Sequence, residues 1–130
     1  MTDVSPSTRG VRSLILGAAL FLSCVYFYEA GGWNQNSRFD TVRAVVGHRT
    51  LQIDRFAANT GDKAVHDGHY YSDKAPGVAL SAIPIVELAS RMLRVSGVDP
   101  ESASGVTALS YVATVIVSGL STALAAVCLA

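Results

Sequence analysis

DGHYYSDKAPG, residues Asp67 to Gly77, leads directly into the apolar run VALSAIPI, residues Val78 to Ile85. A polar segment thus delivers Lys74 to the start of an expected membrane helix, where water meets lipid. The ammonium of such a lysine can pair with an anion while its stem lies along apolar surface. This suits a phosphate attached to a hydrocarbon chain, so the sequence predicts lipid-phosphate chemistry. A lysine that only reaches from a helix end toward water is the simpler alternative.

The composition indicates a membrane protein. Half of the residues are hydrophobic, the formal net charge is zero, and the charges are concentrated between long uncharged runs. The arginines are spread among acids and form no basic stripe, so we expect no nucleic-acid partner. Cys24 and Cys128 both lie in apolar runs, which predicts neither a disulfide nor a cysteine-based metal site.

Three apolar segments can be compared with the roughly 20 residues needed to cross a bilayer. They predict an all-α, polytopic fold with transmembrane helices at residues 13–33, 75–93 and 105–130. The first includes an extension from Ala30 to Trp33. The second is the weakest, because Pro84, Glu87 and Arg91 interrupt it. Glu87 and Arg91 are four residues apart and can pair on one helix face.

The arginines near the ends of these segments predict the orientation. Arg9 and Arg12 precede the first span, and Arg91 and Arg94 follow the second, so the positive-inside rule places both pairs in the cytoplasm. We therefore expect an integral, multi-pass protein of a bacterial inner membrane. Its cytoplasmic segments would be residues 1–12 and 94–104, and its extracytoplasmic loop residues 34–74.

A cleaved signal peptide is the main alternative for the first span, because two arginines before a short apolar run have the right pattern. No small-x-small cleavage site follows Tyr28. We therefore expect the span to be retained.

The extracytoplasmic loop is expected to carry a short amphipathic helix on the membrane surface. The run from Asn34 to Ser37 offers capping side chains, and Phe39, Val42 and Val46 recur at helical spacing. Gly47 or His48 would end this helix. The stretch from Asn59 to His69 reads as a polar loop, and Pro76 suits the first turn of the next helix.

The end of this loop resembles that of membrane glycosyltransferases related to protein O-mannosyltransferase and lipid A aminoarabinose transferase, glycosyltransferase family 39 in the broad sense. These enzymes typically read Tyr-x-x-Lys-Pro-Pro there. This chain reads Tyr71-Ser72-Asp73-Lys74-Ala75-Pro76, so that Ala75 stands in place of one proline.

The start of the loop resembles the same family, in which an acidic pair precedes x-Arg-aromatic. The corresponding run is Gln35-Asn36-Ser37-Arg38-Phe39, so two amides replace the acids. An amide can orient an acceptor but cannot take its proton. If the reaction is retained, Asp40 or Asp54 would have to serve as the base. Each could instead be a solvated charge or pair with Arg43 or Arg55, respectively.

The resemblance implies inverting transfer of a sugar from a polyprenyl-phosphate donor to an acceptor on the extracytoplasmic side. Arg38 and Lys74 would hold the donor phosphate, and Asp40 or Asp54 would activate the acceptor. Residues expected to contact the acceptor or the sugar are Gln35, Asn36 and Tyr71. No cofactor is expected. The partners would be the donor, membrane lipid and the remaining helices of a longer protein, without which we expect the chain to be inactive.

Other readings remain open. The chain could be a non-catalytic membrane subunit that binds lipid or partner helices, or a transporter fragment with Pro84 and Glu87 at mid-membrane. A metal site could also use the cluster Asp62, His66, Asp67 and His69. Because we expect no helix to bring those four residues together, we predict that there is no metal site.

Overall fold

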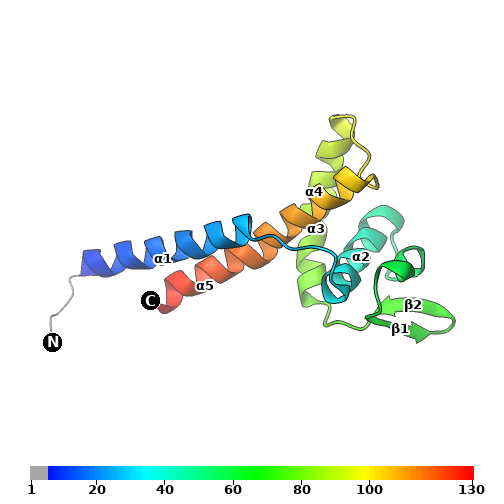
Figure 1. The fold of residues 1–130 in the computed structure, drawn as a ribbon, viewed down its shortest axis with the longest axis horizontal. Helices are drawn as coiled ribbons and strands as arrows, with labels where there is room; N and C mark the ends of the chain where they lie inside the picture. The colour runs from blue at the N-terminus through cyan, green and yellow to red at the C-terminus, as the bar shows by residue number, and fades with distance from the viewer. Residues whose placement is uncertain (1–5) are drawn as a thin grey trace. The chain divides into compact units, whose positions relative to one another are not determined.

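The computed structural model describes residues 6–130, with side chains from residue 9 onward (Figure 1). The chain is mostly helical, so the coarse all-α prediction is confirmed, and a two-stranded hairpin is the exception. The chain divides into two compact units, Met1–Tyr28 with Thr114–Ala130, and Glu29–Ala113.

The first unit is a pair of helical segments that run in opposite directions (Figure 1). Its elements are α1 (Pro6–Tyr26), the π-helical η2 (Thr114–Leu120) and α5 (Ser121–Leu129). The segments meet at glycines: a Cβ on Gly17 would lie 2.5 Å from Val127 Cγ2, and one on Gly119 would lie 3.1 Å from Cys24 Cβ. Small residues let two helix backbones approach closely, as they do in membrane helix pairs.

Two helices among the described residues are long and apolar enough to cross a membrane, Arg9–Tyr26 and Ala103–Leu129. The helix α3 (Gly77–Val95), where we expected the second span, is not one of them and contains Glu87, Arg91 and Arg94. The prediction that the first helix extends to Trp33 is wrong. The helix ends at Tyr26, Gly31 has φ 92°, and Trp33 begins another helix.

The second unit contains three α-helices, α2 (Trp33–His48), α3 and α4 (Ala103–Ala113). α3 packs against both α2 and α4. α2 ends at His48, as predicted, because Arg49 adopts a left-handed conformation with φ 56°. The N–H groups of Arg49 and Thr50 then donate to carbonyls of the last helical turn.

α2 differs from the amphipathic surface helix that the sequence predicted. Its buried residues are mostly polar or small: Ser37, Asp40, Thr41, Val42 and Ala44. Of the expected apolar stripe only Val42 is fully buried, and Phe39 and Val46 are half-buried. The prediction was wrong because hydrogen bonds to the following loop decide which side of α2 faces inward.

A hairpin replaces the expected polar loop. A 3₁₀ helix, η1 (Asp54–Asn59), precedes the antiparallel strands β1 (Lys63–His66) and β2 (His69–Ser72). Asp67 and Gly68 join the strands with φ of 51° and 81°. Two positive φ values give a turn whose twist matches that of a hairpin, and Asp-Gly is a favoured pair for it.

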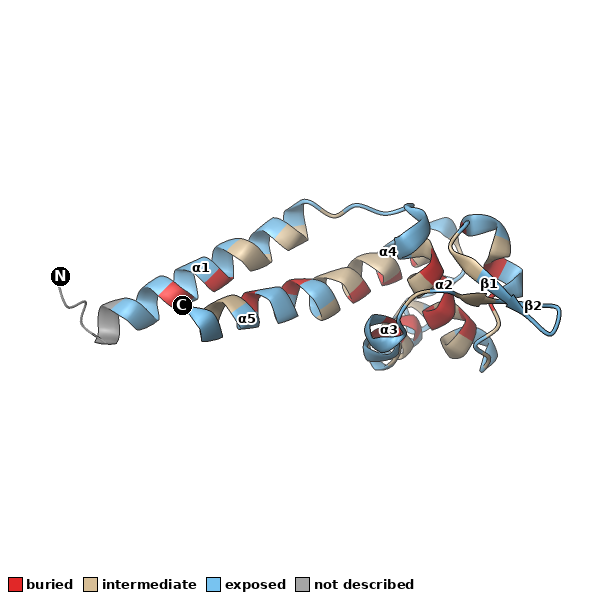
Figure 2. Ribbon diagram, turned by 90° about the horizontal axis from the view of Figure 1, so that it is seen from below, coloured by how far each residue is buried: buried red, intermediate tan, exposed pale blue. Residues whose placement is uncertain are grey.

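Fully buried residues are few in both units (Figure 2). The apolar core of the second unit includes Ala44, Ile53 and Phe56, which join the end of α2 to η1. The backbone N–H of Ile53 donates to the Tyr70 carbonyl at 2.8 Å, which ties this core to β2. The hairpin and the segment after it are thereby held beside α2.

Candidate anion-binding site

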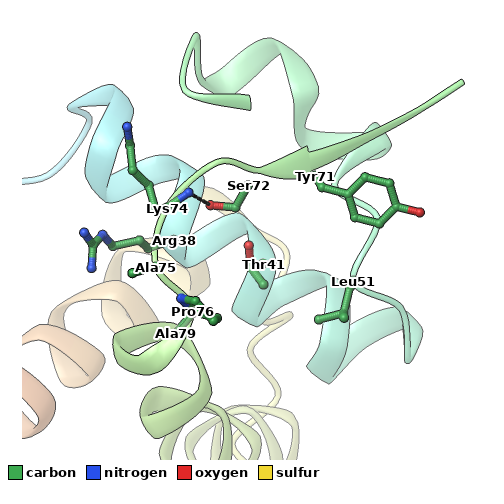
Figure 3. A pocket seen from close by; sticks show the side chains of 9 residues that line it. All are labelled: Arg38, Thr41, Leu51, Tyr71, Ser72, Lys74, Ala75, Pro76 and Ala79. Carbon is green, nitrogen blue, oxygen red and sulfur yellow. Dashed lines mark hydrogen bonds between the residues drawn. The ribbon is translucent and has the colours of Figure 1, made fainter. Parts of the chain in front are cut away.

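A cavity of about 210 Å³ lies in the second unit, between α2 and the segment that connects β2 to α3 (Figure 3). It brings together three predicted residues: Arg38 from the motif at the start of the loop, and Tyr71 and Lys74 from the motif at its end. In the view of Figure 3, Arg38 and Lys74 lie on one side, and Tyr71 lies on the other. The remaining lining residues are Thr41, Leu51, Ser72, Ala75, Pro76 and Ala79.

Arg38 lies on α2 and is half-buried. Its Nε donates to Asn34 Oδ1 at 2.9 Å, one helical turn earlier, which fixes the direction of the side chain. No carboxylate in the described part of the chain forms an ion pair with it. The planar guanidinium therefore has charge and donors to offer to an anion such as phosphate.

Lys74 has acidic partners, in contrast to Arg38. Its Nζ lies 3.0 Å from Asp62 Oδ2 and 3.2 Å from Asp73 Oδ1, and its side chain is 23% exposed. Hydrogen bonds to Asp62 and Asp73 raise the pKa of Lys74, and these carboxylates keep the ammonium charged. An arriving phosphate would share the ammonium with Asp62 and Asp73 or replace them.

The first turn of α2 holds the segment from Asn59 to Asp62. Asn36 Nδ2 donates to the Asn59 carbonyl at 2.7 Å, and Ser37 Oγ donates to the Asp62 carbonyl at 2.6 Å. Thr60 Oγ1 donates in return to the Trp33 carbonyl at 2.8 Å. These bonds place the Asp62 carboxylate beside Lys74.

The residues predicted to contact the sugar or the acceptor are therefore separated. Tyr71 lines the cavity, and its hydroxyl accepts from Gln52 Nε2 at 3.4 Å. Gln35 is exposed and does not line the cavity, and the Asn36 amide is used in the bond to Asn59. These contacts stay predictions, and the geometry favours Tyr71 alone.

Asp40, the first predicted base, is buried beside the core and does not line the cavity. Arg43 Nη1 lies 3.2 Å from its Oδ1, and Asn59 Nδ2 lies 3.4 Å from the same atom. Oδ2 is buried and has no hydrogen-bond partner among the described residues. Burial raises the pKa of Asp40 against the opposing effects of Asn59 and Arg43, because an ion is less well solvated in the interior.

The surroundings of Arg43 explain how Asp40 is held. Arg43 bridges to Glu101, just before α4, with 2.6 Å from Nη2 to Oε2. Its guanidinium carbon also lies 4.0 Å from the centre of the Phe56 ring. The suggested Asp40–Arg43 pair is thus present, and it belongs to a network that connects α2 with the residues preceding α4.

Asp54, the second predicted base, anchors the hairpin. Its Oδ2 lies 2.7 Å from His69 Nδ1, and its Oδ1 accepts from the Tyr70 N–H at 2.6 Å. These bonds, with Tyr70 the larger influence, lower the pKa of Asp54. The suggested partner Arg55 instead contacts His48. Asp54 does not line the cavity.

The four residues considered for a metal site are divided among other contacts. Asp62 pairs with Lys74, His69 pairs with Asp54, and His66 lies 3.4 Å from Asp67. Within the described residues, no three His, Cys, Asp or Glu side chains are grouped to hold a metal.

Sequence reasoning missed the roles of Ser37, Asp62 and Ser72. We interpreted Ser37 as a capping residue, but its side chain is fully buried between the loop and β2. Asp62 was considered as a metal ligand and, less favourably, as a base, but its carboxylate pairs with Lys74. The one sequence signal for the two serines was their nearness to the predicted phosphate ligands. Ser37 precedes Arg38, and Ser72 stands two residues before Lys74.

No protein-family model matches the chain, and neither a curated protein nor a solved structure matches it. The resemblance to membrane glycosyltransferases thus rests on the loop motifs.

Proposed function

We propose that this chain is the N-terminal part of a membrane glycosyltransferase that takes a sugar from a polyprenyl-phosphate donor on the extracytoplasmic side. The observation that carries the proposal is the meeting of Arg38 and Lys74 in one cavity with Tyr71. The two cations come from opposite ends of the loop. The sequence motifs alone predict each of them as a phosphate ligand.

The distribution of side-chain size on α1 and α3 supports membrane embedding. On α1, Leu14, Ile15 and Leu22 are exposed, whereas Gly17 is buried. A water-soluble protein tends to bury its large apolar residues, and exposed apolar surface of this extent marks a binding face or a lipid contact. Small residues between helices and large ones outside suit a lipid environment.

The same pattern occurs on α3, in the other unit. Its buried residues are Ala79, Ala82, Val86 and Ser90, and exposed apolar residues include Leu80, Leu88 and Met92. This supports contact of α3 with lipid or with further membrane helices, despite its charges. Glu87 accepts from Arg91 at 2.9 Å, the pairing expected from their spacing, and from Arg49 at 3.4 Å. Paired charges are less costly within or near a membrane than single ones.

In the proposed reaction, an acceptor hydroxyl or amine attacks the anomeric carbon, and the bond from that carbon to the donor phosphate breaks. Negative charge develops on the departing phosphate. Arg38 and Lys74 would stabilise this charge, because fixed cations aimed at developing charge lower the barrier. Tyr71 would pack against the sugar or the prenyl chain.

The acceptor must also lose a proton. Of the two predicted bases, Asp40 has the more suitable chemistry, because its raised pKa makes it the stronger base. Asp54 is stabilised as an anion by two donors and is the weaker base. Neither acid lines the cavity, so the acceptor side of the site would depend on helices outside this chain.

That separation favours a second candidate function. A non-catalytic membrane subunit could bind a lipid phosphate through Arg38 and Lys74 without a base beside the phosphate. The amides Gln35 and Asn36, in place of the acidic pair, fit this function. Sugar transfer from a labelled polyprenyl-phosphate donor by the complete protein distinguishes the two candidates, since a subunit would bind the donor and transfer nothing.

Binding of an isoprenyl monophosphate to the chain in lipid nanodiscs tests the anion site directly. We expect Lys74→Ala and Arg38→Ala to weaken binding at least tenfold each, about the effect of removing one charge-assisted contact. Lys74→Arg should restore only part of the affinity, because its planar fork differs from a point charge.

Matched controls are available outside the cavity. Lys63→Ala and Arg55→Ala each remove one positive charge of the same kind, and neither residue lines the cavity. They should leave binding within about twofold of the unsubstituted chain. Equal losses in the control and site variants would reduce the proposal to non-specific attraction between a basic surface and an anion.

A further inference from the structure

Two serines join the positions that carry the two cations of the cavity. Ser37 directly precedes Arg38 on α2, and Ser72 ends β2 two residues before Lys74. Their Oγ atoms lie 2.6 Å apart, which is hydrogen-bonding distance. The side chain of Ser37 is fully buried, so the Ser37 end of this bond is shielded from water.

The hydroxyl protons have one consistent arrangement. A hydroxyl carries a single proton and can also accept. Ser37 donates to the Asp62 carbonyl at 2.6 Å, so Ser72 must supply the proton between the two serines. The oxygen of Ser72 remains free to accept the backbone N–H of Lys74 at 3.3 Å (Figure 3). The bonds therefore run from Lys74 through Ser72 and Ser37 to Asp62.

The ion pair closes this path into a ring. The Asp62 carboxylate meets the Lys74 ammonium at 3.0 Å, so backbone and side chain of both residues take part. The ring fixes Lys74 at its N–H and at its Nζ, and one member of the ring directly precedes Arg38. Two cations on separate segments would otherwise lose conformational freedom on binding one anion.

We propose that the Ser37–Ser72 hydrogen bond is a positioning element, which sets Lys74 beside Arg38 so that both can bind one phosphate. This inference rests on the proposed function, because it takes the cavity to be a phosphate site. Ser37 and Ser72 act through Lys74. Because they hold the lysine in place before the phosphate arrives, less conformational freedom is lost on binding.

Substitutions at Ser72 test this role, because Ser72 is only half-buried and tolerates a change better than Ser37. Ser72→Ala and Ser72→Val remove the hydroxyl, whereas Ser72→Thr keeps it, with Val and Thr of nearly equal size. Ser81→Ala is the matched control, since Ser81 is exposed and its hydroxyl donates to the Gly77 carbonyl in its own helix. The probes are an isoprenyl monophosphate in nanodiscs and inorganic phosphate in solution.

We expect Ser72→Ala and Ser72→Val to weaken the binding of both probes about three- to tenfold, the effect of one hydrogen bond. Ser72→Thr and Ser81→Ala should bind as the unsubstituted chain does. In a Lys74→Ala background, Ser72→Ala should have no further effect, which a merely structural role would not produce. Circular dichroism and thermal unfolding identify any variant that does not fold. The comparison of Ser72→Thr with Ser72→Val then shows whether the hydroxyl itself is needed for binding.

Two outcomes would overturn the inference while leaving the phosphate site intact: unchanged binding by Ser72→Val, or an undiminished loss in the Lys74→Ala background. A loss confined to inorganic phosphate would also contradict it, since the same lysine should serve the lipid headgroup. If the unsubstituted chain binds neither probe, the proposed function fails, and this inference fails with it.

Discussion

Asp40 and Asp54 are two carboxylates to which the sequence gives the same role, yet their surroundings differ. Asp40 is 2% exposed and shares Arg43 with Glu101, and one of its oxygens has no hydrogen-bond partner in the described part of the chain. The Asp54 side chain is 39% exposed and uses both oxygens, one for His69 and one for the Tyr70 N–H. Their pKa values accordingly move in opposite directions.

Solvation and the number of hydrogen-bond donors determine what each carboxylate can do. Burial makes the Asp40 anion less stable, so that carboxylate takes up a proton more readily. Two well-placed donors make the Asp54 anion more stable and give it a structural role in the hairpin. The same residue type thus serves as a candidate base in one region and as an anchor in the other.

The largest expected difference between the two regions is in turnover. If Asp40 is the general base of the complete protein, Asp40→Asn should reduce the rate of sugar transfer by about 10²-fold or more, the usual contribution of such a base. Asp54→Asn should reduce it less than tenfold, because this acid is already occupied. Steady-state transfer from a labelled polyprenyl-phosphate donor is the measurement. Full activity of both variants would assign the base to a residue outside this chain.

Removing each side chain should also separate the two regions in stability. Asp40→Ala should lower the free energy of unfolding by about 3 kcal/mol, because Arg43 stays nearly buried and keeps Glu101 as its one ionic partner among the described residues. Asp54→Ala should have a smaller effect, confined to the hairpin. Denaturant unfolding in detergent gives the first value, and amide exchange of β1 and β2 gives the second. A larger global loss at Asp54 would reverse the comparison.

The pH dependence of stability should have opposite signs at the two sites. The pKa of Asp40 is raised on folding, so its stabilising protonation is complete below the ordinary value of 3.8 and is lost as pH rises through the raised pKa. The pKa of Asp54 is lowered, so its contribution is present above 3.8 and is lost as pH falls through the lowered pKa.

Unfolding measured from about pH 2 to 7 for each Asn variant tests these signs. The advantage of the unsubstituted chain over Asp54→Asn should grow with rising pH. Its stability relative to Asp40→Asn should fall over the same range. Two curves of the same sign would mean that the buried and exposed acids do not differ as their contacts indicate.

The sequence predicted those parts of the fold that depend on apolar length and local spacing. Long uncharged runs indicated α1 and the helical run that ends with α5, and four-residue spacing predicted the pairing of Glu87 with Arg91. It could not predict which side of α2 is buried. Hydrogen bonds from Asn36 and Ser37 to the distant Asn59–Asp62 segment decide that orientation. Such bonds produce no periodic pattern of residues in the sequence.

The candidate site shows the same division. The two cations were found because each stands in a short motif with a clear chemical reason. Ser72 and Asp62 were missed because their importance comes from contacts between segments that are separate in the sequence. The role of Asp54 was missed for a related reason: its partners His69 and Tyr70 become neighbours only once the unexpected hairpin forms.

The smallest expected effect is in the turn of the hairpin that Asp54 anchors. Gly68 has φ 81°, a conformation that costs other residues about 1–2 kcal/mol. Gly68→Ala should therefore loosen the hairpin and increase amide exchange in β1 and β2. Gly47→Ala is the matched control, because a Cβ there meets nothing within 4 Å and its backbone is helical.

If Asp54 is the anchor, combining Gly68→Ala with Asp54→Asn should release β2 from η1 while leaving the Asp40–Arg43 pair in place. Loss of both regions together in the double variant would show that hairpin and buried network form one cooperative structure, and the contrast between the two acids would then describe only their local chemistry.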